Sequence, residues 1–186
     1  MIKQVSVLVM VIFIVVGCAS TPGNTKAEKR DSILKMKREV LAELNKLKPD
    51  ANNEISKAPG YAVFSNVNVH ILIAGVGGGY GVVKNNKTGK HTYMKMGEAG
   101  LGLGLGVKDF RVVFVFHDEK TMNHFIESGW EFGGQADAAA KSGSKGEAVS
   151  GEASFRNITI YPITKSGLAL QATVKGTKYW KDPDIN

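Results

Sequence analysis

The fold of this chain is decided by two glycine-rich stretches, Gly75-Val-Gly-Gly-Gly-Tyr-Gly-Val-Val83 and Gly100-Leu-Gly-Leu-Gly-Leu-Gly-Val107. Glycine recurs at every second position of each stretch, at Gly75, Gly77, Gly79 and Gly81 and then at Gly100, Gly102, Gly104 and Gly106. Successive side chains of a β-strand point to opposite faces. Each stretch therefore predicts a strand with one bare face and one apolar face.

Two interpretations of the bare faces stay open. Alternating glycines weaken a strand unless close packing or strong curvature compensates, which favours a tightly coiled barrel or a sheet pressed against a helix. The alternative is a smooth groove for an acyl chain or another flat ligand. A phosphate loop is excluded, because the G-x-G-x-x-G spacing requires glycine where Tyr80 and Val107 stand.

Period-two patterns extend from these stretches over most of the chain and predict a sheet. The expected strands cover residues 61–67, 69–83, 91–96, 100–107, 111–116, 133–140, 154–163 and 168–175, with a hairpin turn at 85–89 and a loop at 142–148. The segment 111–116, Arg-Val-Val-Phe-Val-Phe, is typical of a buried strand.

Helical patterns occur in two places. Between residues 28 and 47 a stripe of apolar residues at three- and four-residue steps predicts an amphipathic helix, formed by Ile33, Met36, Val40, Leu44 and Leu47. Asp118 is expected to cap a short helix that ends at Ile126. The predicted fold class is α+β and β-rich: a curved antiparallel sheet or partly closed barrel with an N-terminal amphipathic helix and one short mid-chain helix.

Length and cysteine content limit the protein further. A chain of 186 residues suits one domain with a short appendage. Its single cysteine forms no internal disulfide, and 24 Lys and Arg against 17 Asp and Glu leave a net charge of +7. The chain is therefore a basic globular protein that depends on its core for stability.

The N-terminus has the pattern of an export signal. Lys3 precedes a short apolar run at residues 5–16, which is too short to span a membrane as a helix. Val15-Val-Gly-Cys18 resembles the lipobox of bacterial lipoproteins, in which the cysteine is acylated. We expect residues 1–17 to be a lipoprotein signal peptide, 18–27 a lipidated tether and 28–186 the folded domain. An ordinary signal peptide cut near Ala19 or Pro22 is the alternative.

Basic residues form two candidate contact regions for anionic lipid. Each Lys or Arg near a charged surface adds about 1 kcal/mol to the binding free energy. One region is the polar face of the expected helix and the other is the 85–89 turn with its flanks. The candidate residues are Lys29, Arg30, Lys35, Lys37, Arg38, Lys84, Lys87 and Lys90. A solvated, solubilising surface explains the same residues as well.

Enzyme motifs are weak. Residues 32–35 and 142–145 fit S-x-x-K, but the Ser-Asp-Asn element that accompanies it in penicillin-binding enzymes is absent. His70, His91, His117 and His124 show no metal-ligand spacing. We expect no catalytic residue, metal or cofactor, and no nucleic acid partner.

Several motifs together resemble the SYLF domain, a lipid-binding module whose family includes actin-binding proteins of the yeast cortex. They are residues 59–67, Pro-Gly-Tyr-Ala-Val-Phe-Ser-Asn-Val, the glycine run 75–83, Lys108-Asp-Phe-Arg111 before the buried strand, and Thr164-Lys-Ser-Gly-Leu168. The resemblance implies a module that binds anionic phospholipid through a basic helix and adjoining lysines.

The resemblance and the N-terminus together predict a non-enzymatic lipoprotein that binds an anionic phospholipid membrane. Ala19 after the cysteine favours the periplasmic face of the outer membrane, by analogy with lipoprotein sorting. A bacterial lipoprotein would not meet actin, so only lipid binding is carried over. The alternative is a structural or scaffold lipoprotein whose partner is another envelope protein. The sequence leaves the oligomeric state undetermined.

Overall fold

The computed structural model describes residues 21–71, 74–101, 106–132, 153–155, 157–164, 167–168 and 177–186. Within these ranges the helices are α2 (Lys26–Leu47), α3 (Ala51–Lys57) and α4 (Glu119–Ser128). The strands are β1 (Gly60–Ile71), β2 (Ala74–Asn85), β3 (His91–Leu101), β4 (Gly106–Phe116), β5 (Trp130–Phe132), β6 (Ala153–Phe155), β7 (Ile158–Thr164), β8 (Gly167–Leu168) and β9 (Thr177–Lys181).

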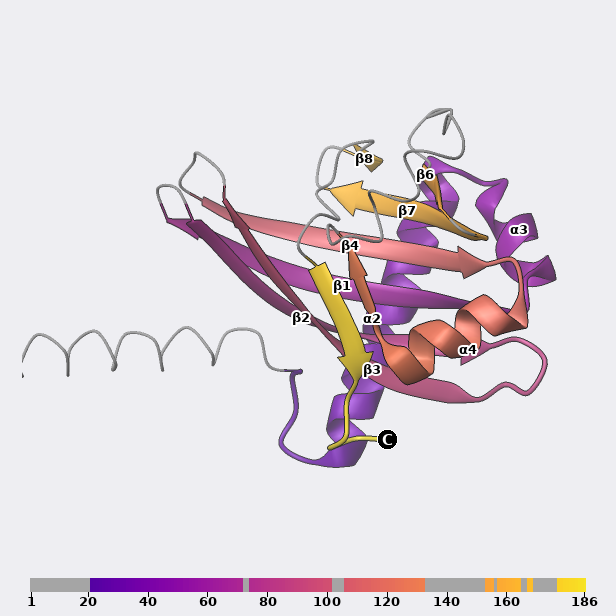
Figure 1. Ribbon diagram of the computed structural model, residues 1–186, viewed down its shortest axis with the longest axis horizontal. Helices are drawn as coiled ribbons and strands as arrows, with labels where there is room; N and C mark the ends of the chain where they lie inside the picture. The colour runs from indigo at the N-terminus through magenta and orange to yellow at the C-terminus, as the bar shows by residue number, and fades with distance from the viewer. Residues whose placement is uncertain are drawn as a thin grey trace, which may run out of the picture.

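All the described strands belong to one antiparallel sheet. Their order is β5-β9-β3-β2-β1-β4-β7-β6, with β8 paired to β7. The long strands β1 to β4 bend together, so the sheet is strongly curved (Figure 1). The predicted α+β fold with a curved antiparallel sheet is confirmed.

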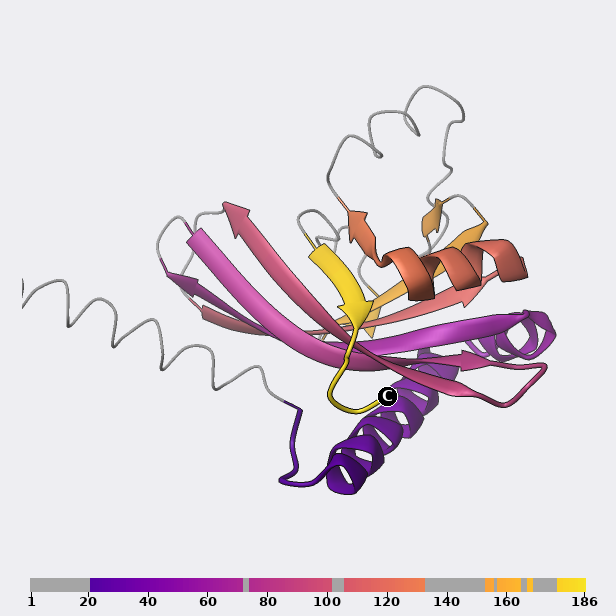
Figure 2. The same ribbon diagram turned by 60° about the horizontal axis from the view of Figure 1, so that its bottom comes forward.

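The helices α2 and α4 cover opposite faces of this sheet (Figure 2). The apolar stripe of α2, which includes Ile33 and Val40, packs on one face against Tyr61 and Val63 of β1. Met122 and Phe125 of α4 belong to a second core on the other face. The two cores lie on opposite faces of the same strands. Both faces of the central strands are therefore covered along the middle of their length.

Strand β4 shows why a continuous apolar run was needed. Every side chain from Val112 to Phe116 is buried, with Val113 and Val115 on the α2 side and the others on the α4 side. Burying each such side chain stabilises the fold by about 1.5–3 kcal/mol. The prediction of a buried strand at residues 111–116 is confirmed.

Close packing against strand β1 explains two of the alternating glycines. Phe64 lies opposite Gly81 on the neighbouring strand, and a Cβ at Gly81 would overlap the Phe64 ring and the carbonyl oxygen of Val63. At Gly79 a Cβ would overlap the carbonyl oxygen of Ser65. Because Gly81 carries no side chain, the Phe64 ring can pack edge-on against Tyr179, with the ring centroids 4.7 Å apart. At these two positions close packing is sufficient to require glycine.

Three predicted strand boundaries are wrong. The break expected at residue 68 is absent: Asn68 pairs with Gly77 in the middle of β1 and β2, and the chain reverses between Ile71 and Ala74. Residues 100–107 are not one strand, because β3 ends at Leu101 and β4 begins at Gly106. The predicted strand at 154–163 is a hairpin of β6 and β7. Asn157, with φ of 64°, breaks it.

Other local predictions are confirmed. The N-terminal helix, the turn after Asn85 and the Asp118-capped helix all form, although α4 continues to Ser128. Helix α3 and strands β5 and β9 were not predicted. The predictions for residues 133–140, 142–148 and 169–175 lie outside the described residues.

Candidate anionic-lipid interface

The basic helix α2 begins at a well-defined cap. The Thr25 hydroxyl accepts a hydrogen bond from the Glu28 amide at 3.1 Å, and the Glu28 carboxylate accepts from the amides of Asn24 and Thr25. These backbone hydrogen bonds lower the pKa of Glu28. This capping box fixes where the first turn of α2 starts and therefore where its cations lie.

The predicted cations of α2 divide into exposed and engaged residues. Lys35 and Arg38 are exposed, and no carboxylate partner for them occurs among the described residues. Lys29 is partly buried and contributes to lowering the pKa of Asp184, after the larger effect of Lys95. Among the predicted cations of α2, Lys35 and Arg38 are therefore the two that are available to a planar anionic surface.

Arg30 has a structural role. Its Nε donates to the carbonyl oxygen of Ile185 at 2.7 Å, and its guanidinium carbon lies 5.6 Å from the centre of the Tyr93 ring. A cation over an aromatic face is worth roughly 0.5–2 kcal/mol. Arg30 therefore fastens the start of α2 to β3 and to the C-terminal residues.

Lys37 meets two other bases at the seam between α2 and the sheet. Its Nζ donates to Nε2 of His91 at 3.0 Å, and His91 lies directly opposite Lys84 in the β2–β3 pair. Burial lowers the pKa of Lys37, and the charges of Lys84 and Arg38 lower it further. The pKa of His91 is lowered by burial and then by Lys37 and Lys84. The seam thus concentrates positive charge.

The β2–β3 hairpin is rigidly held. Its Asn85 side chain accepts from the amides of Lys87 and Thr88, both at 2.9 Å, while Asn86 donates to the carbonyl oxygens of Ile55 and Ala58. Lys87 forms an ion pair with Glu119 of α4 at 2.6 Å. Of the predicted hairpin lysines, Lys90 is exposed and Lys84 belongs to the α2 seam.

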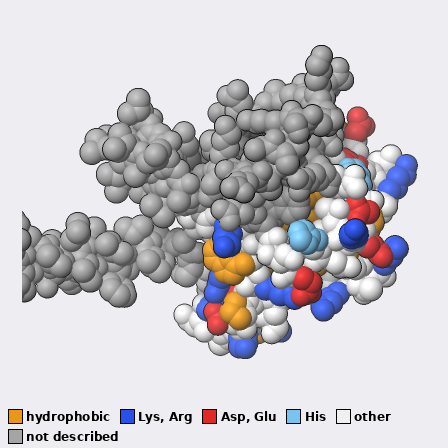
Figure 3. All heavy atoms as spheres, viewed as in Figure 1, with side chains coloured by type: hydrophobic (Ala, Val, Ile, Leu, Met, Phe, Trp, Pro, Cys, Tyr) orange, Lys and Arg blue, Asp and Glu red, His pale blue; other side chains and the backbone are white. Residues whose placement is uncertain are grey.

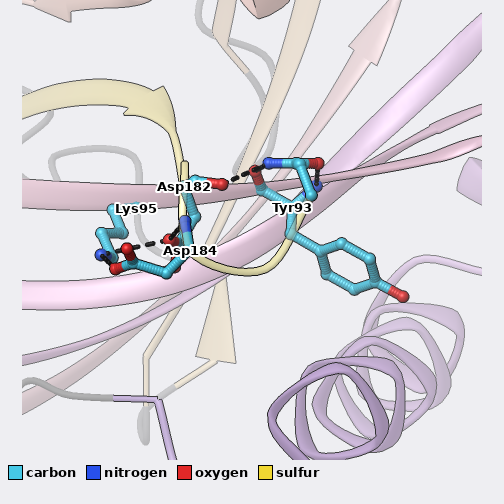
Figure 4. A network of polar contacts seen from close by, with 5 residues as sticks. Tyr93, Lys95, Asp182 and Asp184 are labelled. Atoms are coloured by element: carbon cyan, nitrogen blue, oxygen red, sulfur yellow. Dashed lines mark hydrogen bonds and ion pairs between the residues drawn. The ribbon is translucent and has the colours of Figure 1, made fainter. Parts of the chain in front are cut away.

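The C-terminal residues complete the edge of β3 (Figure 4). Lys95 contacts Asp184 at 2.9 Å and the buried Asp182 at 3.1 Å, and these contacts raise its pKa, the hydrogen bond to Asp184 most. The backbone amide of Tyr93 donates to the Asn186 side chain, and its carbonyl oxygen accepts from Asp182 and Asn186. No sequence pattern indicated this network.

Charge on the visible surface is mixed. Figure 3 shows Lys and Arg side chains interspersed with Asp and Glu over the described part of that face. Opposite charges also meet in the ion pair between Arg111 and Glu43, at 2.5 Å. Binding to an anionic surface would therefore depend on particular groups of cations rather than on a uniform field.

One polar cluster has the residue types of a hydrolase but not the geometry. Nε2 of His117 lies 2.7 Å from the Thr159 hydroxyl and 3.4 Å from a Glu54 carboxylate oxygen. A catalytic triad needs the acid on the other imidazole nitrogen, so that it can orient the base. Tyr161 also donates to Glu54. The cluster joins α3 to β7 and to His117, which directly follows β4.

The described residues contain no group of three or more His, Cys, Asp and Glu side chains placed to hold a metal ion. None of their helices has both the length and the apolarity to cross a membrane.

The remaining predicted site residues divide by location. Cys18, Gly102 and Gly104 lie outside the described residues. Gly75 and Gly77 are in β2, Gly100 is at the end of β3 and Gly106 begins β4. Gly100 and Gly75 are cross-strand partners, so the two stretches meet at one end of the β2–β3 pair.

Comparison with known proteins matches this chain to one family. Residues 97–186 match the Ysc84 family, described as Las17-binding protein actin regulator. The chain is also 36% identical over 162 residues to Beta cell expansion factor A of Aeromonas veronii. That alignment covers 87% of this chain and 60% of the relative.

Proposed function

We propose, from the premise that residues 97–186 belong to the Ysc84 (SYLF) family, that this protein is a non-enzymatic, lipid-anchored envelope protein whose folded domain binds anionic phospholipid. The observation that carries the proposal is the pair of exposed cations Lys35 and Arg38 on α2, for which the described residues provide no carboxylate. They lie on a helix that follows directly on the tether predicted at residues 18–27.

The geometry of α2 supports an approach of this helix to a membrane surface. Its apolar residues Ile33, Met36, Val40 and Leu44 are buried in the core, so they are not available for insertion into lipid. Attraction would instead come from charge, at about 1 kcal/mol for each Lys or Arg near an anionic surface. The acyl anchor expected on Cys18 would hold the domain at the membrane. We propose that the domain lies at the periplasmic face of the outer membrane.

Vesicle co-sedimentation tests lipid binding. The chain from Thr21 onward is used without its acyl group, because both hydrophobic cores lie between Ile33 and Ile185. We expect it to sediment with phosphatidylglycerol vesicles and not with phosphatidylcholine vesicles. Replacing Lys35 and Arg38 together by Gln should weaken binding about thirtyfold, which corresponds to about 2 kcal/mol.

The matched control neutralises two exposed lysines elsewhere, Lys57 on α3 and Lys120 on α4, with the same change in net charge. This control variant should retain most of the binding. Arg30 is left unchanged in both variants because it fastens α2 to the sheet. Equal recovery with neutral and anionic vesicles would contradict the proposal.

A further inference from the structure

A cleft of about 510 Å³ crosses the edge of β3 at residues His91 to Tyr93. Strand β9 pairs with β3 only from Met94 to Glu98, so this part of the edge is not covered by a neighbouring strand. The hairpin, the start of α2, helix α4 and the C-terminal residues surround it: the lining includes Lys90, Arg30, Asn123 and Asn186.

The cleft carries an excess of positive charge. The basic side chains in its lining are those of Arg30, Lys90, His91 and Lys181, and the one acidic side chain in that lining is Glu127. Glu127 is already paired with Lys181 at 2.8 Å. For the other three bases the described residues provide no carboxylate partner within ion-pair distance.

His91 connects the cleft with the bases behind it. Lys37 can only donate to Nε2 of His91, so the proton of the neutral ring resides on Nδ1. Lys84 faces His91 from β2, and Arg38 lies near Lys37 on α2. The positive charges repel one another in this partly buried seam, and a bound anion would reduce that repulsion.

The donors suit a phosphoryl group in particular. Arg30 uses Nε for Ile185, which leaves its terminal amino groups for an anion, and Lys90 and His91 supply further N–H groups. A phosphomonoester has three terminal oxygens and a charge of about −1.5 to −2 at neutral pH. Charge-assisted hydrogen bonds to such oxygens are about twice as strong as neutral ones. The volume also admits the glycerol unit to which a lipid phosphate is attached.

We propose that the β3-edge cleft binds a phosphomonoester anion through Arg30, Lys90 and His91, with the headgroup of a lipid such as phosphatidic acid as its source. The proposal rests on the anionic-lipid function above and adds a stereospecific site to it. The exposed residues Lys35 and Arg38 would attract any anionic surface, whereas the cleft would select the phosphate that can enter it.

The site is tested with the full chain in lipid nanodiscs, by NMR of the His91 imidazole, which is assigned by its loss in His91→Gln. In neutral nanodiscs inorganic phosphate should shift the His91 signals in a saturable way and raise the His91 pKa by about one unit. Lys37→Met should weaken this binding about tenfold, while Lys46→Met, at an exposed position of the same helix, should not. Unshifted His91 signals would overturn the proposal, as would equal effects of the two variants.

The lipid source is tested with nanodiscs that contain either phosphatidic acid or phosphatidylglycerol at matched surface charge. We expect the His91 shift with phosphatidic acid only. A response to inorganic phosphate and to neither lipid would overturn the headgroup assignment. This outcome differs from failure of the general function, which would abolish the preference for phosphatidylglycerol vesicles and its dependence on Lys35 and Arg38 while leaving the phosphate response of His91 intact.

Discussion

Gly81 shows how one residue without a side chain allows a large one to pack. The Phe64 ring occupies the space in which a Cβ at Gly81 would lie, and Phe64 in turn contacts Phe114, Phe125 and Tyr179. The alternating glycines therefore cannot be treated as flexible positions. At residues 79 and 81 they are part of the core.

Gly81→Ala is expected to destabilise the protein by about 1–3 kcal/mol, because an added methyl group in a filled core forces side chains or backbone to move. Urea unfolding followed by circular dichroism measures the change. Gly89→Asn is the control, since Gly89 has φ of 73° with open space around it and Asn tolerates that conformation. An unchanged unfolding midpoint for Gly81→Ala would contradict the packing explanation.

Lys37→Met is expected to raise stability in the absence of an anion. Burial and neighbouring cations lower the pKa of Lys37 in the folded state, so its charge opposes folding at neutral pH. The unfolded chain binds more protons between the lowered pKa and the usual value of 10.5, and the stability of the unmodified protein therefore rises with pH there.

Thermal unfolding from pH 7 to 10.5 measures this effect. The gain from Lys37→Met should be largest at pH 7 and diminish as the pH rises. Lys35→Met should alter stability by less than about 0.5 kcal/mol at any of these values, as exposed substitutions usually do. A destabilised Lys37→Met variant would show that this lysine is satisfied without an anion.

Elements differ in how visible they were in the sequence. Helix α2 was predicted because its buried residues repeat at helical spacing, and β4 because both of its faces are covered and its run is continuously apolar. Helix α3 was missed since only Ala51 and Ile55 of its seven residues are buried. β9 was missed because its five residues are too few for a distinctive pattern.

The candidate site was only partly predictable for a related reason. The turn after Asn85 places Lys84 opposite His91. This pairing follows from a predicted hairpin at these residues. The contact of Lys37 with His91 joins residues 54 positions apart and arises from the docking of α2 on the sheet. The attachment of the C-terminal residues to Tyr93 depends on the same tertiary arrangement, which no local spacing encodes.

Helix α4 provides a test at the scale of an element. Asp118 accepts from the Thr121 amide and hydroxyl and from Asn157, and these hydrogen bonds, led by the Thr121 amide, lower the Asp118 pKa. The stabilisation is present above the usual pKa of 3.8 and is lost as the pH falls through the lower folded-state pKa.

Asp118→Asn should therefore lower the thermal midpoint above about pH 4, with the difference from the unmodified protein shrinking toward pH 2. Asp50→Asn is the control, because Asp50 stands at the N-cap of α3 without a side-chain cap hydrogen bond. A difference that stayed constant across this range would contradict an ionised cap at Asp118.

At the scale of the whole molecule, attachment and recognition are separate properties. Both hydrophobic cores are formed by residues between Ile33 and Ile185, whereas the proposed anchor depends on Cys18 alone. Cys18→Ser should abolish acyl labelling in cells and leave an unprocessed precursor. Thermal stability of the folded body should not change. Normal acyl labelling of this variant would exclude Cys18 as the anchor.

The position of β9 affects when the chain can finish folding during its synthesis. Lys178 pairs with Gly97 of β3, and β9 separates β3 from β5 in the sheet. Pairings between residues so far apart form slowly, because a long loop must close first. The sheet cannot be completed until residues 177–181 have left the ribosome. For a protein that we propose is exported, this delay would keep the nascent chain open long enough to be threaded across a membrane.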